Sequence, residues 1–144
     1  MAMDVFRSLD VGGQLEELAL TVFLEAEGES PRGKLGVASC IMNRVRDPRF
    51  PDNPAAVVHQ KWQFSCHNDD MEAWRDKRLE GHAHDPNWTD SWRAAAAAFF
   101  GFERDPTGGS CHYCTQEVAE STSWAKGKIP AAIIGSHNYY STVR

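Results

Sequence analysis

The sequence predicts an α+β protein that is mostly helical and carries a small β-hairpin. Apolar residues recur at helical spacing over residues 15–29 and 31–46, and an alanine run marks a further helical segment over 88–102. Stretches rich in β-branched and aromatic residues follow only near the C-terminus, at 110–115 and 133–141. Because helical patterns fill most of the chain, we expect these two strands to form one hairpin segregated from the helices.

The composition is that of one soluble domain covering residues 1–144. The chain is 42% hydrophobic and 24% charged, and its net charge of −5 includes no block of like charge. Nucleic acid and anionic membranes are therefore not expected partners, and we expect a monomer without membrane insertion. The N-terminus MAMDVFRSLD has no basic segment followed by an apolar one. We therefore expect no signal peptide and synthesis in the cytoplasm.

The first helical segment places one carboxylate at the edge of an apolar stripe. The stripe recurs at helical spacing and consists of Leu15, Leu18, Ala19, Val22 and Ala26. At 100° per residue Glu25 falls beside Leu18, and Gly28 is the expected helix stop. A carboxylate half-sunk against a core holds its proton to higher pH, as a general acid must. The alternative is a helix that ends in solvated glutamates.

The remaining elements follow from caps and breakers. Residues 4–13 are expected to be an irregular lead-in that ends in two glycines, and Ser30–Pro31 cap the start of the second helix. That helix should stop before the Asp-Pro pair at 47–48. Residues 55–59 are expected to form a helical turn and 70–79 a short helix. The two long helices would then meet in a corner close to the end of the first.

Four cysteines leave the question of metal open. Cys40 fits an apolar helical pattern, whereas Cys111 and Cys114 form a CxxC. Together with Cys66 and a histidine they are a conceivable structural zinc site. There is no second CxxC and no spaced histidine pair, so we expect reduced thiols, no metal and no cofactor.

Several motifs in fixed order resemble one enzyme family. The order is LTVFLEAEGES-PRGKLGVASCIMNRV, WQFS, DPTGG, HY and IGSHNYY, which spans residues 15–140. It resembles the SleB-type cell wall hydrolases, which include spore-cortex-lytic enzymes and phage lysins. The resemblance implies a lysozyme-like fold close to goose-type lysozymes and lytic transglycosylases, with peptidoglycan glycan strands as substrate. The cysteines of CHYC depart from the family pattern.

The resemblance also assigns the catalytic residue. The first glutamate of the family's E-A-x-G-E block corresponds to Glu25. A lytic transglycosylase needs only this acid to cleave between N-acetylmuramic acid and N-acetylglucosamine, leaving an anhydro-muramic end. A hydrolytic muramidase, the alternative, usually needs a second carboxylate. The rivals for that role sit where aspartate commonly caps a loop or helix, and they are Asp69, Asp70, Asp85 and Asp90.

Polar and aromatic residues of the other motifs are candidate substrate contacts. They are Gln63, Phe64, Ser65, His112, Tyr113, His137 and Tyr139. The alternative for Phe64 and for each histidine is a satisfied core residue. Trp62 and Trp124, the tryptophans closest to family motifs, are candidate sugar-stacking residues, and Trp74, Trp88 and Trp92 are expected in the core. The turn DPTGG over 105–109 is expected to fix the chain before the first strand.

Two rival functions belong to other classes. A zinc-dependent peptidoglycan amidase or peptidase would use as ligands Cys66, His67, Cys111, His112 and Cys114. A wall-binding module would hold peptidoglycan without cleaving it. The family's separate peptidoglycan-binding module is not visible in the sequence, so we expect a bare catalytic domain that acts on the cell wall, as in phage-encoded lysins released at lysis.

Overall fold

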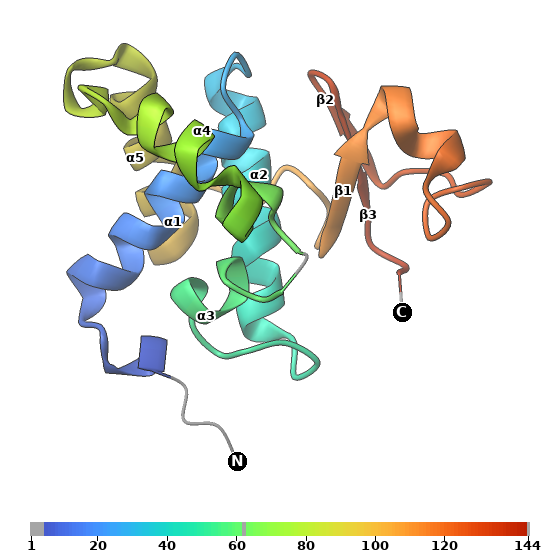
Figure 1. Ribbon diagram of the computed structural model, residues 1–144. Coiled ribbons are helices and arrows are strands. Elements are labelled where there is room, and N and C mark those ends of the chain that lie inside the picture. Colours follow the sequence, from blue (N-terminus) through green and yellow to red (C-terminus); the bar gives the residue numbers. More distant parts are fainter. Residues whose placement is uncertain (1–4, 62, 144) are drawn as a thin grey trace.

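The structure, a computed structural model, describes residues 5–61 and 63–143. Within these ranges a helical body lies on one side and a small antiparallel sheet on the other, so the predicted α+β class is confirmed (Figure 1). The body consists of α1 (Val11–Glu25), α2 (Pro31–Arg46), α3 (Pro54–Val58), α4 (Glu72–Leu79) and α5 (Pro86–Phe100). The sheet consists of β1 (His112–Thr115), β2 (Ala132–Ile134) and β3 (His137–Tyr140). Short 3₁₀ helices cover Val5–Ser8, Ser65–His67, Asp69–Met71, His82–His84 and Gln116–Ser121.

Helix α1 contributes a large part of the hydrophobic core. All five residues of its predicted apolar stripe are buried, and they contact residues of α2 and α5 in one cluster. The helix begins at Val11 because the side chain of Asp10 accepts a hydrogen bond from the backbone N–H of Gly13. Gly12 and Gly13, which were expected to precede the helix, therefore lie inside its first turn. The helix ends at Glu25, and Gly28, at φ 81°, lies in the turn to α2.

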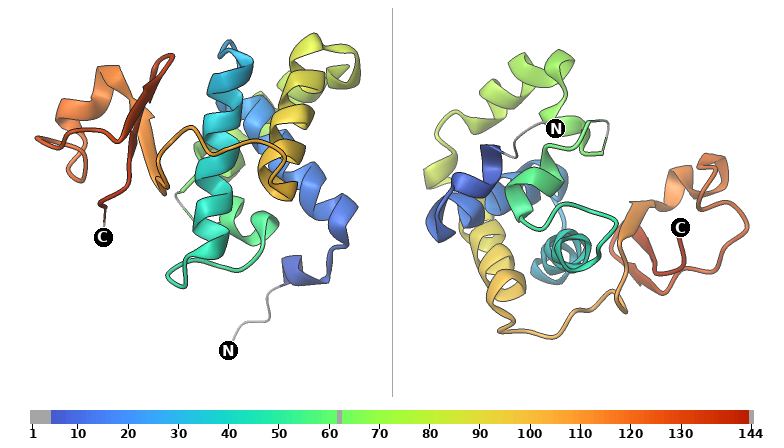
Figure 2. Two further views of the ribbon diagram at one scale, coloured as in Figure 1. Left: turned by 180° about the vertical axis from the view of Figure 1, so that it is seen from behind. Right: turned by 90° about the horizontal axis from the view of Figure 1, so that it is seen from below.

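Helix α2 stands between the two parts of the molecule. Ser30 caps its start and Asp47 its end, as predicted. The two views of Figure 2 show α1 and α5 on one side of this helix and the sheet on the other. Gly36 allows the sheet to approach closely, since a Cβ there would lie 2.6 Å from the hydroxyl of Tyr139. None of the described helices is long and apolar enough to cross a membrane.

The sheet differs from the predicted hairpin in one respect. Residues 133–141, expected as one strand, are divided between β2 and β3 by a turn at Gly135 and Ser136. Gly135 has φ 57°, a left-handed conformation that glycine adopts at no steric cost, so the chain reverses there. The strand order is β1-β3-β2.

The register of the sheet decides which side chains face the helices. Tyr113 pairs with Tyr139, and Thr115 pairs with His137. Because side chains alternate along a strand, Tyr113, His137 and Tyr139 share the face that packs against α2. His112 and Tyr140 share the opposite face.

The turn predicted at DPTGG fixes β1 against α2. The carboxylate of Asp105 accepts hydrogen bonds from the backbone N–H groups of Thr107 (2.7 Å) and Gly109 (3.0 Å). The side-chain amide of Asn43 on α2 donates both to Asp105 (2.8 Å) and to the carbonyl of Ser110 (2.9 Å). The start of β1, and with it the position of Tyr113, is therefore tied to the central helix.

Candidate active site

Glu25 lies at the junction between the helical body and the sheet. As the last residue of α1 it is half-buried, and its Oε1 accepts a long hydrogen bond of 3.5 Å from the backbone N–H of Cys66. Burial raises the pKa of Glu25, and the hydrogen bonds from Cys66 oppose this only in part. The carboxyl group therefore keeps its proton to higher pH than an exposed glutamate, as proposed from its place beside the apolar stripe.

Tyr113 reaches the same junction from the sheet. Burial is the largest cause that raises the pKa of Tyr113 well above its usual value, and the charge of Glu25 is the second. Its phenol therefore stays protonated at neutral pH and can donate a hydrogen bond. The Tyr113 ring lies edge-on to His137, with centroids 4.9 Å apart, and 5.7 Å from the ring of Tyr139. An aromatic wall from β1 and β3 thus stands next to the carboxyl group.

The segment after α3 is locked in place by a buried arginine. The guanidinium of Arg44 on α2 donates to the Gln63 side-chain oxygen (2.9 Å) and to the carbonyl of Cys111 (2.7 Å). Phe64 is only 4% exposed, and Arg44 lies over its ring. Gln63 and Ser65 are exposed on either side of it. Sequence reasoning missed Arg44, which stands inside the apolar pattern IMNRV without any local signal of a partner.

His112 is not brought to Glu25. It lies on the outer face of the sheet, where its ring is 5.3 Å from that of Trp124 and 6.2 Å from that of Phe50. Burial, followed by the charges of Arg44 and other cations, lowers the pKa of His112 to about 4. Strand alternation places its side chain on the face of the sheet opposite to that of Tyr113, and its role as a substrate contact stays a prediction. Trp124 lies with it, and Trp62 is outside the described residues.

The remaining sequence candidates are divided between several places. Asp85 caps α5 by accepting a hydrogen bond from the N–H of Asn87. Trp74 and Trp92, expected in the core, are 39% and 36% exposed, because α4 and α5 each present one side to solvent. Trp88 packs against the core, as expected.

The cysteines do not converge on a metal site in the described part of the chain. All four are free, and no group of three or more His, Cys, Asp or Glu side chains there is arranged to hold a metal ion. Cys66 faces Glu25, whereas Cys114 packs on the outer face of the sheet with Tyr140. The ligands that a zinc-dependent amidase would require are thus divided, with Cys66 on the helical side of the sheet and Cys114 on its outer face.

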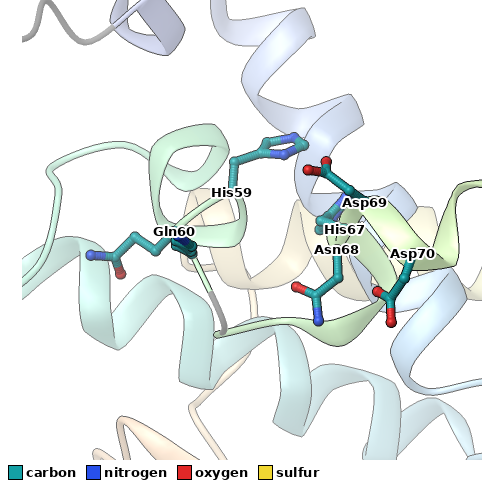
Figure 3. A pocket seen from close by; sticks show the side chains of 7 residues that line it. His59, Gln60, His67, Asn68, Asp69 and Asp70 are labelled. Atoms are coloured by element: carbon teal, nitrogen blue, oxygen red, sulfur yellow. The ribbon is translucent and has the colours of Figure 1, made fainter.

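A pocket of about 500 Å³ opens between the end of α3 and the segment from His67, and Glu25 is not among the described residues that line it. Its lining comes from two stretches of chain, the end of α3 and the segment from His67, as Figure 3 shows. The lining residues are His59, Gln60, Lys61, His67, Asn68, Asp69 and Asp70. Nε2 of His59 lies 2.7 Å from Oε2 of Glu17. Asp69 and Asp70, the first rivals for a second catalytic carboxylate, therefore face this pocket.

One family of cell wall hydrolases accounts for most of the chain. The family called Cell Wall Hydrolase matches residues 28–140, and the chain belongs to this family. The matched region begins three residues after Glu25. The predicted family is therefore confirmed, while the role of Glu25 stays a prediction.

Curated relatives and solved structures agree with this assignment. The chain is 29% identical to the spore cortex-lytic enzyme of Halalkalibacterium halodurans over 85% of its length, and 29% identical to that of Bacillus subtilis over 83%. It spans about a third of the length of these relatives, 33% and 35%. The catalytic domain of the germination-specific lytic transglycosylase SleB from Bacillus anthracis has the same fold. It superposes with a TM-score of 0.70 at 24% identity, over 92% of this chain and 97% of that one. The SleB catalytic domain of Bacillus cereus superposes equally well, at 22% identity over 96% and 98%.

Proposed function

We propose that this chain cleaves the glycan strand of peptidoglycan between N-acetylmuramic acid and N-acetylglucosamine as a lytic transglycosylase, with Glu25 as acid and then base. The observation that carries the proposal is the half-buried carboxyl group of Glu25, whose pKa is raised by burial. Among the described residues its perturbing neighbour is Cys66, and no second carboxylate contributes to the shift. A single acid without a carboxylate partner suits a mechanism that uses no water.

The two steps conserve every atom. Protonated Glu25 gives its proton to the glycosidic oxygen, and the bond from that oxygen to C1 of muramic acid breaks as positive charge develops on the sugar ring. The Glu25 carboxylate then takes the proton of the muramic acid's own 6-hydroxyl, whose oxygen bonds to C1. The product carries a 1,6-anhydro ring, and Glu25 is again protonated. Tyr113, with its phenol held protonated, would orient the sugar beside the acid.

The comparisons support the same substrate. The curated relatives are named spore cortex-lytic enzymes, and a structural neighbour is described as a germination-specific lytic transglycosylase. The proposal carries this activity over to the present chain, which would act on the cell wall as a monomer. The exposed Gln63 and Ser65 remain proposed substrate-site residues, as do His137 and Tyr139, which are buried like Phe64.

Mass spectrometry of the muropeptides released from purified peptidoglycan tests the proposal. A transglycosylase leaves muramic ends that are lighter by one water than the reducing ends left by a hydrolase. We expect anhydro ends with wild-type protein and a strongly reduced release of muropeptides with Glu25→Gln. Reducing ends throughout would instead establish the hydrolytic muramidase, and Asp69 and Asp70 would be the first residues to test as its base. Release of free stem peptides would establish the amidase.

A further inference from the structure

A second glutamate of the same sequence block, Glu29, is built into the sheet side of the site. Its Oε1 accepts a hydrogen bond of 3.1 Å from the backbone N–H of Ser136, and its Oε2 one of 3.2 Å from the hydroxyl of the same residue. The side chain of Glu29 is only 14% exposed. Its own backbone carbonyl accepts a hydrogen bond of 2.5 Å from Nζ of Lys34, which is buried. Glu29 thus joins the start of α2 to the turn between β2 and β3.

Two glycines leave the space that the Glu29 side chain fills. A Cβ at Gly135 would overlap its Oε1, so a side chain there would displace the Glu29 carboxylate from its place. A Cβ at Gly33 would lie 2.9 Å from the Cβ of Glu29. The backbone on both sides therefore closes on this carboxylate. The glycine at the β2–β3 turn serves the approach of Glu29 as well as the positive φ of the turn.

The same carboxylate faces the imidazole of His137. The Nδ1 atom of His137 lies 3.7 Å from Oε1 of Glu29, and it is buried without a hydrogen-bond partner among the described residues. Burial lowers the pKa of His137 and the charge of Glu29 opposes this, so the ring is neutral at neutral pH. A neutral imidazole carries its proton on one nitrogen, and a carboxylate next to Nδ1 favours the proton there. The lone pair then stands on Nε2.

His137 in turn contacts Tyr113, the tyrosine whose pKa the charge of Glu25 raises. The two rings are edge-on with centroids 4.9 Å apart. A change in the orientation of His137 would therefore shift the ring of Tyr113, which interacts with the proposed catalytic acid Glu25. Glu29 is therefore linked to Glu25 by contacts with His137 and Tyr113 and by the electrostatic interaction of Tyr113 with Glu25.

We propose that Glu29 is a positioning residue of the active site, which holds the β2–β3 turn and fixes His137 with its proton on Nδ1, so that Nε2 is free to accept a hydrogen bond from the sugar. This inference rests on the proposed function, because the substrate that His137 would meet is the muramic acid of the glycan strand. Glu29 itself touches neither the sugar nor the reacting atoms. Sequence reasoning assigned it no role, since it lies beyond the glycine that ends the first helical pattern.

The test combines the variant Glu29→Gln with nitrogen NMR of the His137 ring. Glutamine keeps the shape of glutamate, but its amide group can donate toward Nδ1. We therefore expect the proton of His137 to move to Nε2 in the variant, and kcat on peptidoglycan to fall about 10- to 100-fold with a smaller change in KM. Glu27→Gln is the matched control, since Glu27 lies two residues earlier on the surface and pairs with Arg78. It should change neither the NMR signals of His137 nor kcat.

A measurement on the wild-type protein keeps the inference falsifiable if the variant does not fold, and further measurements apply if it does. In wild-type protein the imidazole signals of His137 must report the Nδ1–H tautomer, and the Nε2–H tautomer would overturn the inference. In the folded variant, an unchanged tautomer or an unchanged kcat would overturn it as well. In a His137→Gln background, Glu29→Gln should cost less than it does alone, whereas an equal loss would reduce Glu29 to a structural residue. The proposed function fails separately, if the wild type releases no anhydro products.

Discussion

The backbone N–H of Cys66 points at Oε1 of Glu25 across 3.5 Å. This contact joins the end of α1 to the segment that follows α3, 41 residues further along the chain. It leaves the carboxyl group short of strong hydrogen-bond donors, because an N–H at this distance is at the limit of a hydrogen bond. Burial therefore dominates, and the pKa of Glu25 rises.

Replacing Glu25 by glutamine should remove activity and spare the fold. We expect a loss of about 10²- to 10⁴-fold in the rate of peptidoglycan cleavage, the range that general acid–base catalysis supplies. The melting temperature should stay the same or rise, since the native state disfavours the charged carboxylate that the variant lacks. Turbidity clearing of peptidoglycan and thermal unfolding are the measurements. Glu27→Gln serves as the control, and wild-type clearing by Glu25→Gln would show that the acid lies elsewhere.

The pH dependence of cleavage should reflect the state of Glu25. The first step needs its protonated form, so the rate falls as pH rises through its raised pKa. The side-chain hydrogen bond from Cys66 lowers that pKa, and Cys66→Ala removes it. We therefore expect the alkaline limb of the profile to move to higher pH in this variant. A limb that stays in place, or moves to lower pH, would contradict the assignment of this limb to Glu25.

The helices and the position of Glu25 could be predicted because their signals are local. An apolar stripe at helical spacing, a serine before a proline and an Asp-Pro pair each act within a few residues. The division of 133–141 into two strands was missed because Gly135 and Ser136 stand inside a run with β-strand composition. Their turn depends on contacts with Glu29, which is 107 residues away in the sequence.

The candidate site could be predicted only in part for the same reason. Alternation along β1 separates His112 from Tyr113, but the sequence does not say which of the two faces the helices. That choice depends on the packing of Tyr139 against Gly36. Arg44 and Glu29 were missed because their partners, Gln63 and Ser136, come close only in the folded chain.

Acid should destabilise the protein through His67. Its Nε2 lies 2.8 Å from the hydroxyl of Thr21, which donates its own proton to the carbonyl of Glu17, so the imidazole must be the donor. Burial lowers the pKa of His67 from 6.5 to about 4. Between these values the unfolded chain binds a proton that the native state excludes. The stability from this group is therefore complete above pH 6.5 and is lost as pH falls toward 4.

Urea unfolding of wild type and His67→Gln between pH 7.5 and 4.5 measures this contribution. Glutamine keeps a donor for Thr21 but does not titrate. We expect the wild type to lose up to about 1.4 kcal/mol more stability per pH unit than the variant below pH 6.5. Parallel pH curves for the two proteins would show that His67 titrates alike in both states.

Cleavage should be independent of metal. The thiols that a zinc ion would need do not converge among the described residues, and Cys66 lies beside Glu25. Cys111 is also held next to the guanidinium of Arg49, whereas Cys114 faces Tyr140 on the outer side of the sheet. We therefore expect EDTA to leave the rate unchanged, and a Cys111→Ser/Cys114→Ser variant to keep most of the wild-type activity. Stoichiometric zinc in elemental analysis, lost together with activity in that variant, would favour the amidase instead. Zinc lost without any change in activity would make it a structural clip on the sheet, and Glu25 would remain the proposed catalytic acid.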